Sequence, residues 1–446
     1  MDYSALSLAR VHFLASLGFF ALFLAIALAL AWVLLFFKIQ ARRTGDAGWT
    51  AAYRLWVRLF ALAFVLALAA SLPLLFQLGS LWPVLMERIG NVIGPLLGFA
   101  VVTGFVLKSC FLGVMLFGQR RVSDLAHTLA VAMVGLGLLL TTGWLAAIVS
   151  WTHSPAGALL IDGRYVLLDW VAAVFNPSMP WLLATLVLGA LITVSFMMMG
   201  VSAWQALQRP LADAERLAFR VGLCVACVAL SLQLANAVGV SQWIAQAQPA
   251  KAAAAAGYWH GDAPARWVLF GWPDAASESN LAELALGRLP DWWLGRSAQG
   301  APLALDDFSG MLPPVAPVFW SFRILVLAGL AMLGVAFVTL LWLHRRKLDP
   351  GTLPRWWLHL LSASGWLGAV ACLAGWSYME LGRQPYAVYN SVTVTEVVGD
   401  TPRGMLIASL GGHLALYALL VTAFVRMVFH AARYGVVPVR KAGARP

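Results

Sequence analysis

Charged side chains are scarce in this chain of 446 residues. Asp, Glu, Lys and Arg together make up 11% of it, whereas 61% of the residues are hydrophobic. A soluble domain carries about 25% charged residues. The composition therefore excludes a protein whose main solvent is water.

Cysteine is also scarce, with four residues in the chain. All of them lie inside apolar runs: Cys110, Cys224, Cys227 and Cys372. Disulfides form in oxidising aqueous compartments, and the pair Cys224-x-x-Cys227 has no second pair to complete a zinc site. The sequence predicts packing roles for the cysteines, with no disulfide framework and no metal site.

Long apolar runs make up most of the chain. Each is long enough to cross a hydrocarbon layer of about 30 Å, and a helix satisfies every backbone polar group within its own segment. We expect an all-α integral membrane protein with nine transmembrane helices. The predicted spans are 12–37, 55–78, 93–117, 125–149, 179–206, 218–240, 319–343, 356–378 and 404–430.

Lys and Arg residues set the predicted orientation. The net charge of +11 is spread in short clusters between apolar runs, which argues against nucleic-acid binding and for cations retained on the cytoplasmic side. These clusters follow spans 1, 3, 5, 7 and 9: Lys38, Arg42, Arg43 and Arg54; Arg120 and Arg121; Arg209, Arg216 and Arg220; Arg345, Arg346, Lys347 and Arg355; Arg433, Arg440, Lys441 and Arg445. The N-terminus is therefore predicted outside and the C-terminus cytoplasmic.

The expected domain organisation has three parts. Residues 1–240 hold helices 1–6, residues 241–318 form a long extracytoplasmic segment, and residues 319–446 hold helices 7–9 with a basic tail. A loop of this length in a compact protein is usually functional or disordered. Its aromatic clusters, which include Tyr258 and Trp259, predict docking onto the membrane surface.

Charge within a span is costly and indicates function, and two charged residues stand out. Lys108 lies about nine residues, roughly 13 Å, from the basic end of span 3. Its side chain cannot cover that distance, so we expect a partner or a water pocket. Arg323 lies early in span 7 and has two interpretations: it extends to the outer interface, or it acts inside the bundle.

Histidine facing histidine or methionine from two helices is how a bundle holds haem. Most of the eight histidines lie at predicted span ends or in loops, where a solvated or capping role is the default. His413 is the one near a span interior. The run Met197–Met199 is interpreted as packing. The pattern predicts no haem-binding pair.

A short motif, Gly382-Arg383-Gln384-Pro385-Tyr386, follows span 8. Further motifs precede it along almost the whole chain: Phe76-Gln77-Leu78-Gly79-Ser80-x-Trp82, Gly200-x-Ser202-Ala203-Trp204, Gln248-Pro249-x-Lys251, Leu269-Phe270-Gly271-x-Pro273-Asp274 and Phe322-Arg323-Ile324. In kind and order they resemble cytochrome bd-type quinol oxidase subunit I, whose signature usually ends in Trp. The resemblance implies nine spans, an outward quinol loop between spans 6 and 7, and the bacterial cytoplasmic membrane. It also implies a partner: a subunit II-like chain or a haem-bearing subunit I-like chain.

The resemblance further implies two b-type haems and, in most members, one d-type haem. Six functional positions of the family are changed in this chain. At four positions where the family has haem ligands, this chain has Phe20, Thr185, Leu325 and Leu373. At two positions of span 3 where the family has glutamates, it has Ala100 and Lys108. We predict no haem, no metal and no catalytic residue here, which leaves quinone as the candidate ligand.

The quinol region is half retained. Lys251 persists, but the glutamate expected five residues later is Ala256. In the family, a carboxylate there could accept a proton from a quinol hydroxyl as a general base. The candidate quinone-binding residues are Gln248, Lys251, Glu380, Arg383 and Gln384. Arg383 also has a structural interpretation, in which it holds Glu380 or loop carbonyls.

Three functions remain open from the sequence. The first is a haem-depleted homologue that acts as a membrane subunit of a bd-type respiratory complex. The second is an active quinol oxidase subunit I with relocated ligands such as His413, His127 or Met199. The third is a transporter or sensor that reuses the fold, with Lys108 and Arg323 as its support. The changed ligand positions favour the first.

Overall fold

The structure is a computed structural model that describes residues 3–262, 264–290 and 292–435. Within these residues, nine helical segments are long and apolar enough to cross a membrane. They are α1 (Tyr3–Thr44), α2 (Ala47–Ser80), α3 with η1 and α4 (Pro83–Phe99, Ala100–Phe105, Val106–Phe117), α5 (Asp124–His153), α7 (Met179–Gln208), α8 (Asp213–Ala247), α10 (Val315–Leu343), α11 with α12 (Arg355–Ser364, Leu367–Arg383) and α13 (Arg403–Tyr434). The nine predicted spans are confirmed, and each lies inside its helix.

Short elements connect the spans. Antiparallel hairpins pair β1 (Ala158–Ile161) with β2 (Arg164–Leu167), β3 (Arg266–Asp274) with β4 (Ser279–Arg288), and β5 (Tyr386–Val388) with β6 (Val392–Thr393). The short helices are α6 (Trp170–Val174), α9 (Pro249–Ala256), η2 (Gly118–Arg120), η3 (Leu305–Phe308), η4 (Pro350–Thr352) and η5 (Val394–Glu396). Side-chain caps begin several helices; for example, Asp46 accepts from Gly48 N (2.8 Å) at the start of α2.

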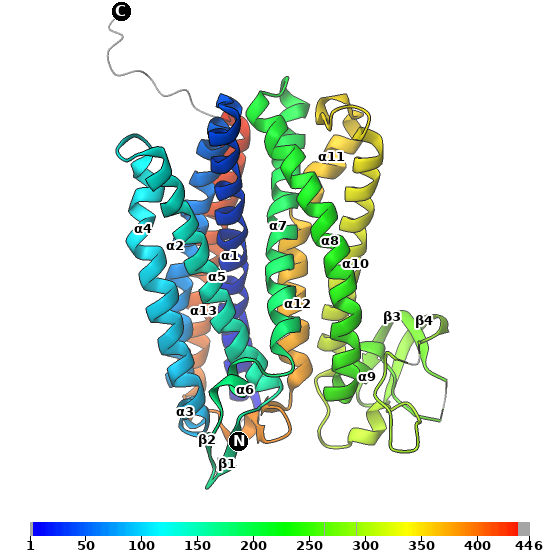
Figure 1. The fold of residues 1–446 in the computed structure, drawn as a ribbon. Helices are drawn as coiled ribbons and strands as arrows, with labels where there is room; N and C mark the ends of the chain where they lie inside the picture. The colour runs from blue at the N-terminus through cyan, green and yellow to red at the C-terminus, as the bar shows by residue number, and fades with distance from the viewer. Residues whose placement is uncertain (1–2, 263, 291, 436–446) are drawn as a thin grey trace, which may run out of the picture.

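The long connections gather on one face of the bundle, here named the hairpin face. It carries residues 154–178, 248–262, 264–290, 292–314 and 384–402, together with the start of α1 (Figure 1). The basic loops lie at the opposite, short-loop face. Which face meets the cytoplasm stays a prediction, and Arg440, Lys441 and Arg445 of the predicted tail lie outside the described residues.

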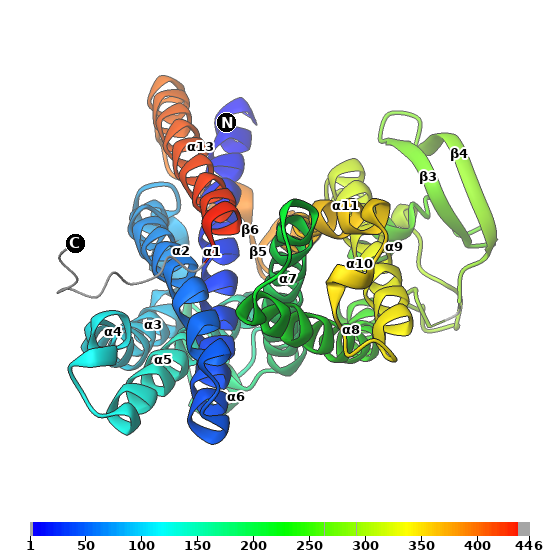
Figure 2. The same cartoon turned by 90° about the horizontal axis from the view of Figure 1, so that it is seen from above.

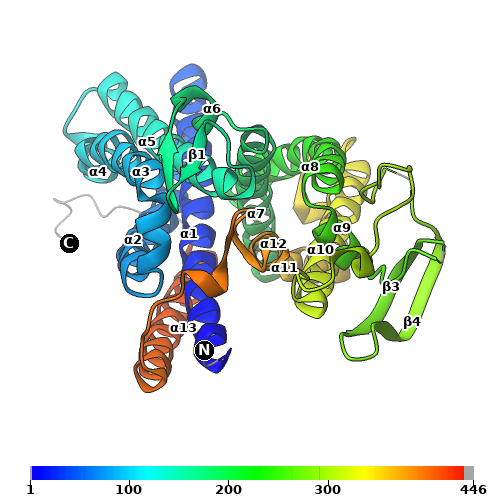
Figure 3. The same ribbon diagram turned by 90° about the horizontal axis from the view of Figure 1, so that it is seen from below.

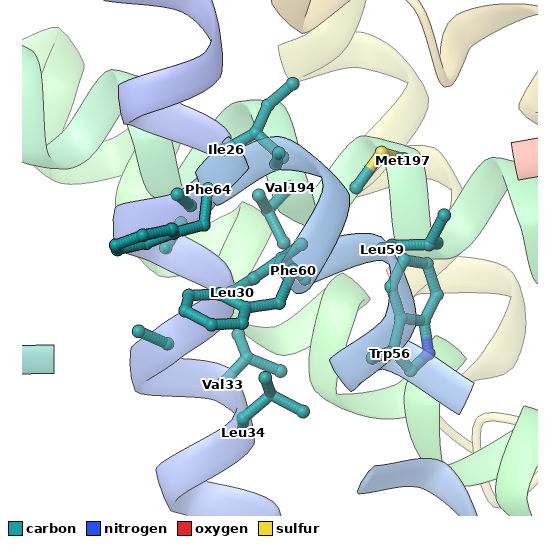
Figure 4. Close-up of a cluster of buried hydrophobic side chains, with 14 of the residues drawn as sticks. Ile26, Leu30, Val33, Leu34, Trp56, Leu59, Phe60, Phe64, Val194 and Met197 are labelled. Carbon is teal, nitrogen blue, oxygen red and sulfur yellow. The ribbon is translucent and has the colours of Figure 1, made fainter. Parts of the chain in front are cut away.

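Helix α1 runs through the centre of the bundle, between a group of α2–α5 and a group of α7, α8 and α10–α12 (Figure 2). The main core joins α1, α2 and α7, where Leu30, Phe60 and Val194 are fully enclosed (Figure 4). Since lipid is as apolar as these side chains, close packing rather than water exclusion holds the helices together.

Glycines allow a close crossing between α7 and α12. On α12, a Cβ at Gly368 would lie 2.5 Å from Thr193 Cα of α7, and a Cβ at Gly200 of α7 would lie 2.9 Å from Gly365 Cα. Both distances are below van der Waals contact, so small residues are required where these backbones meet.

We therefore expect Gly368→Leu to lower the melting temperature of the purified protein by about 5 °C or more, because a side chain there forces α7 and α12 apart. Gly412→Leu is the matched control, since a Cβ there meets nothing within 4 Å. Thermal unfolding in detergent measures the difference. Equal melting temperatures for the two variants would contradict the tight crossing.

Part of the long segment after α8 packs against the bundle. Its alanine run forms α9, in which Ala253 and Ala254 are fully enclosed. Tyr258 is buried in a cluster with α9 and with residues that precede α10. Trp259 is buried in a cluster with α9 and with the first turn of α10. Docking onto the membrane surface is wrong for this pair, because protein covers both rings. Trp292 of the same segment is 42% exposed, so docking through the other aromatic cluster stays a prediction.

Candidate functional site

Six polar side chains meet beneath the hairpin face, and we name them the polar cluster: Thr152, His153, Gln248, Lys251, Glu380 and Arg383. They come from the end of α5, from α9 and the residue before it, and from the end of α12. Figure 3 shows this face, with α9 beside α12. Three segments far apart in sequence therefore supply one site.

An ion pair anchors the cluster. Arg383 Nη2 lies 2.7 Å from Glu380 Oε2, and Arg383 also donates to the Thr152 hydroxyl. Gln248 Nε2 donates to His153 Nδ1 at 2.9 Å. The ring proton of His153 then sits on Nε2, which is buried and lies 4.0 Å from Glu380 Oε1, beyond hydrogen-bond distance.

Lys251 is enclosed, with 2% of its surface exposed. Its Nζ lies 3.4 Å from the Met379 carbonyl oxygen and 4.7 Å from the centre of the Tyr378 ring. Burial lowers the pKa of Lys251 to about 7; the nearby Glu380 opposes this shift and Arg383 adds to it. The side chain passes Gly382, where a Cβ would lie 2.7 Å from its Cγ. This is a physical reason for glycine in the Gly382–Tyr386 motif.

The structure brings together four of the five candidate quinone-binding residues. Gln384 lies next to the cluster, and its side chain lines the cavity described below. Ala256 stands where the family's glutamate is expected, five residues after Lys251, and it is buried among apolar neighbours. Sequence reasoning missed Thr152, His153 and Tyr378, and the position of His153 at the end of a span was the one available signal.

A cavity of about 560 Å³ lies between α1, α2, α3, η1 and α5, and we name it the α1–α5 cavity. Its walls are mainly leucine, isoleucine and phenylalanine side chains. Arg10, Glu380 and Arg383 line it near the hairpin face, and Lys108 lines it deeper in the bundle. The polar cluster and the cavity therefore share a boundary.

Three of the six changed family positions line this cavity: Phe20, Ala100 and Lys108. Leu373 lies on α12, close to Gly18 of α1. Leu325 lies on α10 against Gly375. These positions are thus spread over two regions, on either side of α12.

The side chains at the four expected ligand positions do not fit a haem. Phe20, Leu325 and Leu373 have no lone pair to offer iron. Thr185 donates to the Trp181 carbonyl oxygen and accepts from Asn236, both at 2.8 Å. In the part of the chain that the structure describes, no histidine lines the α1–α5 cavity, and no three His, Cys, Asp or Glu residues form a metal-binding group.

The histidines do not follow the default prediction for span ends. His12, His127 and His153 are 2%, 0% and 4% exposed, because neighbouring helices and the hairpin-face segments cover them. The solvated role is therefore wrong for these three. His12 and His413 form a pair that the sequence did not indicate, with Nε2 and Nδ1 3.2 Å apart.

In this structure, the pair and the other proposed relocated ligands contact protein atoms. Two imidazole nitrogens on opposite sides of one iron lie about 4 Å apart, since each bond is roughly 2.0 Å. The 3.2 Å separation of His12 and His413 leaves no room for it. His127 contacts the Met115 carbonyl oxygen at 3.2 Å, and Met199 is enclosed in the core of α7, α8 and α10–α12.

Arg323 is 8% exposed, and protein carbonyls surround its guanidinium. It donates to Ala255 O of α9 at 2.6 Å and to Val268 O of β3 at 2.5 Å. The residue joins α10 to α9 and β3, two elements of the long segment at the hairpin face.

Residues 8–436 match the family described as cytochrome bd terminal oxidase subunit I. The chain belongs to this family. It is a membrane subunit I of the bd type and a multi-pass protein of the bacterial inner membrane. The family binds haem, which makes the four unsuitable side chains a departure from it.

The relatives of this bd-type subunit I cover nearly its whole length. It is 28% identical to cytochrome bd ubiquinol oxidase subunit 1 of Bacillus subtilis, over 95% of this chain and 94% of that protein. It is 27% identical to cytochrome bd-II ubiquinol oxidase subunit 1 of Escherichia coli, over 97% of each. Its fold matches that of bd oxidase from Geobacillus thermodenitrificans with a TM-score of 0.87, at 23% identity, over 98% of this chain and 100% of that one.

Proposed function

We propose that this chain is a haem-depleted subunit I that serves as a membrane subunit of a bd-type respiratory complex. The observation that carries the proposal is the chemistry at Phe20, Thr185, Leu325 and Leu373, where the described structure offers iron no free donor. A change at one position could be compensated nearby. Changes at all four, in two regions of the bundle, favour the loss of haem.

The polar cluster is the proposed quinone surface. Lys251 Nζ and His153 Nε2 are buried donors, and a quinone carbonyl oxygen accepts hydrogen bonds from such groups. Glu380 is paired with Arg383, and Ala256 has no proton-accepting group. The cluster is therefore suited to holding a quinone headgroup and lacks the expected general base for oxidising a quinol.

A second membrane subunit is the proposed partner, either subunit II-like or a haem-bearing subunit I-like chain. The relatives are each described as subunit 1, which supports a role within an assembly. On this proposal, haem chemistry belongs to the partner, and this chain contributes the scaffold and the quinone surface.

The decisive test is the haem content of the chain, measured by a pyridine haemochrome spectrum on the detergent-purified complex with its subunits resolved. We expect less than one tenth of a haem per copy of this chain. The Escherichia coli bd-II oxidase, purified in the same way, is the positive control. Stoichiometric b or d haem on this chain would overturn the proposal and direct attention to His413, His127 and Met199.

A further inference from the structure

Lys108 places a cation inside the bundle without an anion beside it. Its Nζ donates to the Thr141 hydroxyl at 3.0 Å, and Thr141 in turn donates to the Gly137 carbonyl oxygen at 2.8 Å. Among the described residues, no carboxylate lies within ion-pair distance of this ammonium group. One of its three N–H donors is used by Thr141, which leaves two for another acceptor.

The backbone around Lys108 is built to hold this side chain against the cavity. A π-helical turn, η1, directly precedes α4, and such turns are frequent at functional sites. A Cβ at Gly137 of α5 would lie 2.9 Å from the backbone nitrogen of Lys108. The close approach of α4 and α5 therefore fixes the position from which Lys108 reaches the cavity.

The α1–α5 cavity is elongated and opens sideways. On α1 its lining runs from Arg10 to Leu24, about 21 Å at 1.5 Å per residue. Leu72 of α2 and Val101 of η1 both line the cavity, and they are 57% and 50% exposed. Both residues lie in helices that are long and apolar enough to cross a membrane, so the exposed side of the cavity gives a lipophilic molecule a lateral entrance that avoids water.

We propose that the α1–α5 cavity binds one single-chain amphiphile whose headgroup oxygen accepts a hydrogen bond from Lys108. The apolar walls hold the chain, and the volume of about 560 Å³ falls within the roughly 300–1,000 Å³ of small-molecule pockets. The headgroup is a fatty-acid carboxylate or a quinone carbonyl. The inference rests on the proposed absence of haem, because a haem reaching Phe20 and Ala100 would occupy the same space.

The test uses the purified complex in lipid nanodiscs, loaded with deuterated palmitate or with decylubiquinone. After gel filtration, the retained probe is extracted with solvent and measured by mass spectrometry. Both arms are run in a Lys251→Met background, so that quinone held at the polar cluster is not counted. The variants are Lys108→Met, Lys108→Arg and, as control, Lys347→Met, which removes an exposed lysine at the short-loop face.

We expect about one equivalent of one probe in the Lys251→Met protein, a loss of at least tenfold on adding Lys108→Met, and recovery with Lys108→Arg. Retained palmitate identifies a carboxylate ligand, and retained decylubiquinone a quinone. Equal retention in the Lys108→Met and Lys347→Met proteins, or no retention of either probe, overturns the proposal.

The entrance gives a second test that does not touch the cation. Leu72→Trp should slow probe uptake at least fivefold, whereas Leu330→Trp, on an equally exposed face of α10 that does not line the cavity, should not. Equal uptake in both overturns the lateral entrance. A haemochrome spectrum of each sample separates the two failures: haem on this chain refutes the proposed function, and absence of both haem and probe refutes only this inference.

Discussion

Replacing Lys251 by methionine is expected to weaken binding of a quinone headgroup by roughly 10- to 100-fold. A hydrogen bond to a charged group contributes about 1.5–3 kcal/mol, and each 1.4 kcal/mol is tenfold in affinity. Methionine fills a similar volume, so the change removes the donor with little effect on packing. Titration of the purified complex with decylubiquinone, in a Lys108→Met background to remove the second proposed site, measures the affinity.

The same residue should make quinone affinity depend on pH near neutrality. Burial lowers the pKa of Lys251 to about 7, so its ammonium form predominates below pH 7 and its neutral amine above it. Charge-assisted hydrogen bonds are roughly twice as strong as neutral ones. Affinity should therefore fall as pH rises through 7, and Lys251→Met should give a flat profile.

The control for both measurements is Lys347→Met, which changes the same side chain on the exposed short-loop face. It should leave the affinity and the pH profile unaltered. If Lys251→Met bound quinone as tightly as this control at pH 6, Lys251 would have no part in quinone recognition and the polar cluster would be structural.

Arg323→Leu is expected to detach the long segment from α10. The substitution leaves the carbonyl oxygens of Ala255 and Val268 without the donor that now satisfies them, and each unsatisfied buried acceptor costs about 1–3 kcal/mol. The lost hydrogen bonds weaken the contact of α10 with α9 and β3. Limited proteolysis of residues 257–314 should therefore speed up at least tenfold.

Two further variants make this result specific. Arg266→Leu, an exposed arginine on β3, should leave proteolysis unchanged. Arg323→Lys keeps the charge but loses the planar set of donors, so it should give an intermediate rate. Unchanged proteolysis in Arg323→Leu would show that the remaining contacts of the segment hold it without this residue.

The quinone surface depends on Arg323 indirectly. Arg323 binds the carbonyl of Ala255, near the end of α9, and α9 carries Lys251. Loosening α9 should therefore weaken quinone binding even though Arg323 lies outside the polar cluster. A double variant of Arg323 and Lys251 is expected to be non-additive, because both changes act through the same helix.

The sequence by itself determined the nine spans, the long segment between the sixth and seventh, and the family. Helix formation in lipid is local, since each apolar run must satisfy its own backbone. The motifs around Lys251 and Arg383 were also local, so they could be found without coordinates. The side chains at Phe20, Thr185, Leu325 and Leu373 could be read directly as unsuitable for iron.

Only the tertiary structure decided which of these residues meet. It placed His153 with Gln248, joined Arg323 to the carbonyls of α9 and β3, and paired His12 with His413 across α1 and α13. It also showed that Lys108, Phe20 and Ala100 line one cavity. The physical reason is that these contacts join helices up to 401 positions apart, and the packing that selects them leaves no periodic pattern in the chain.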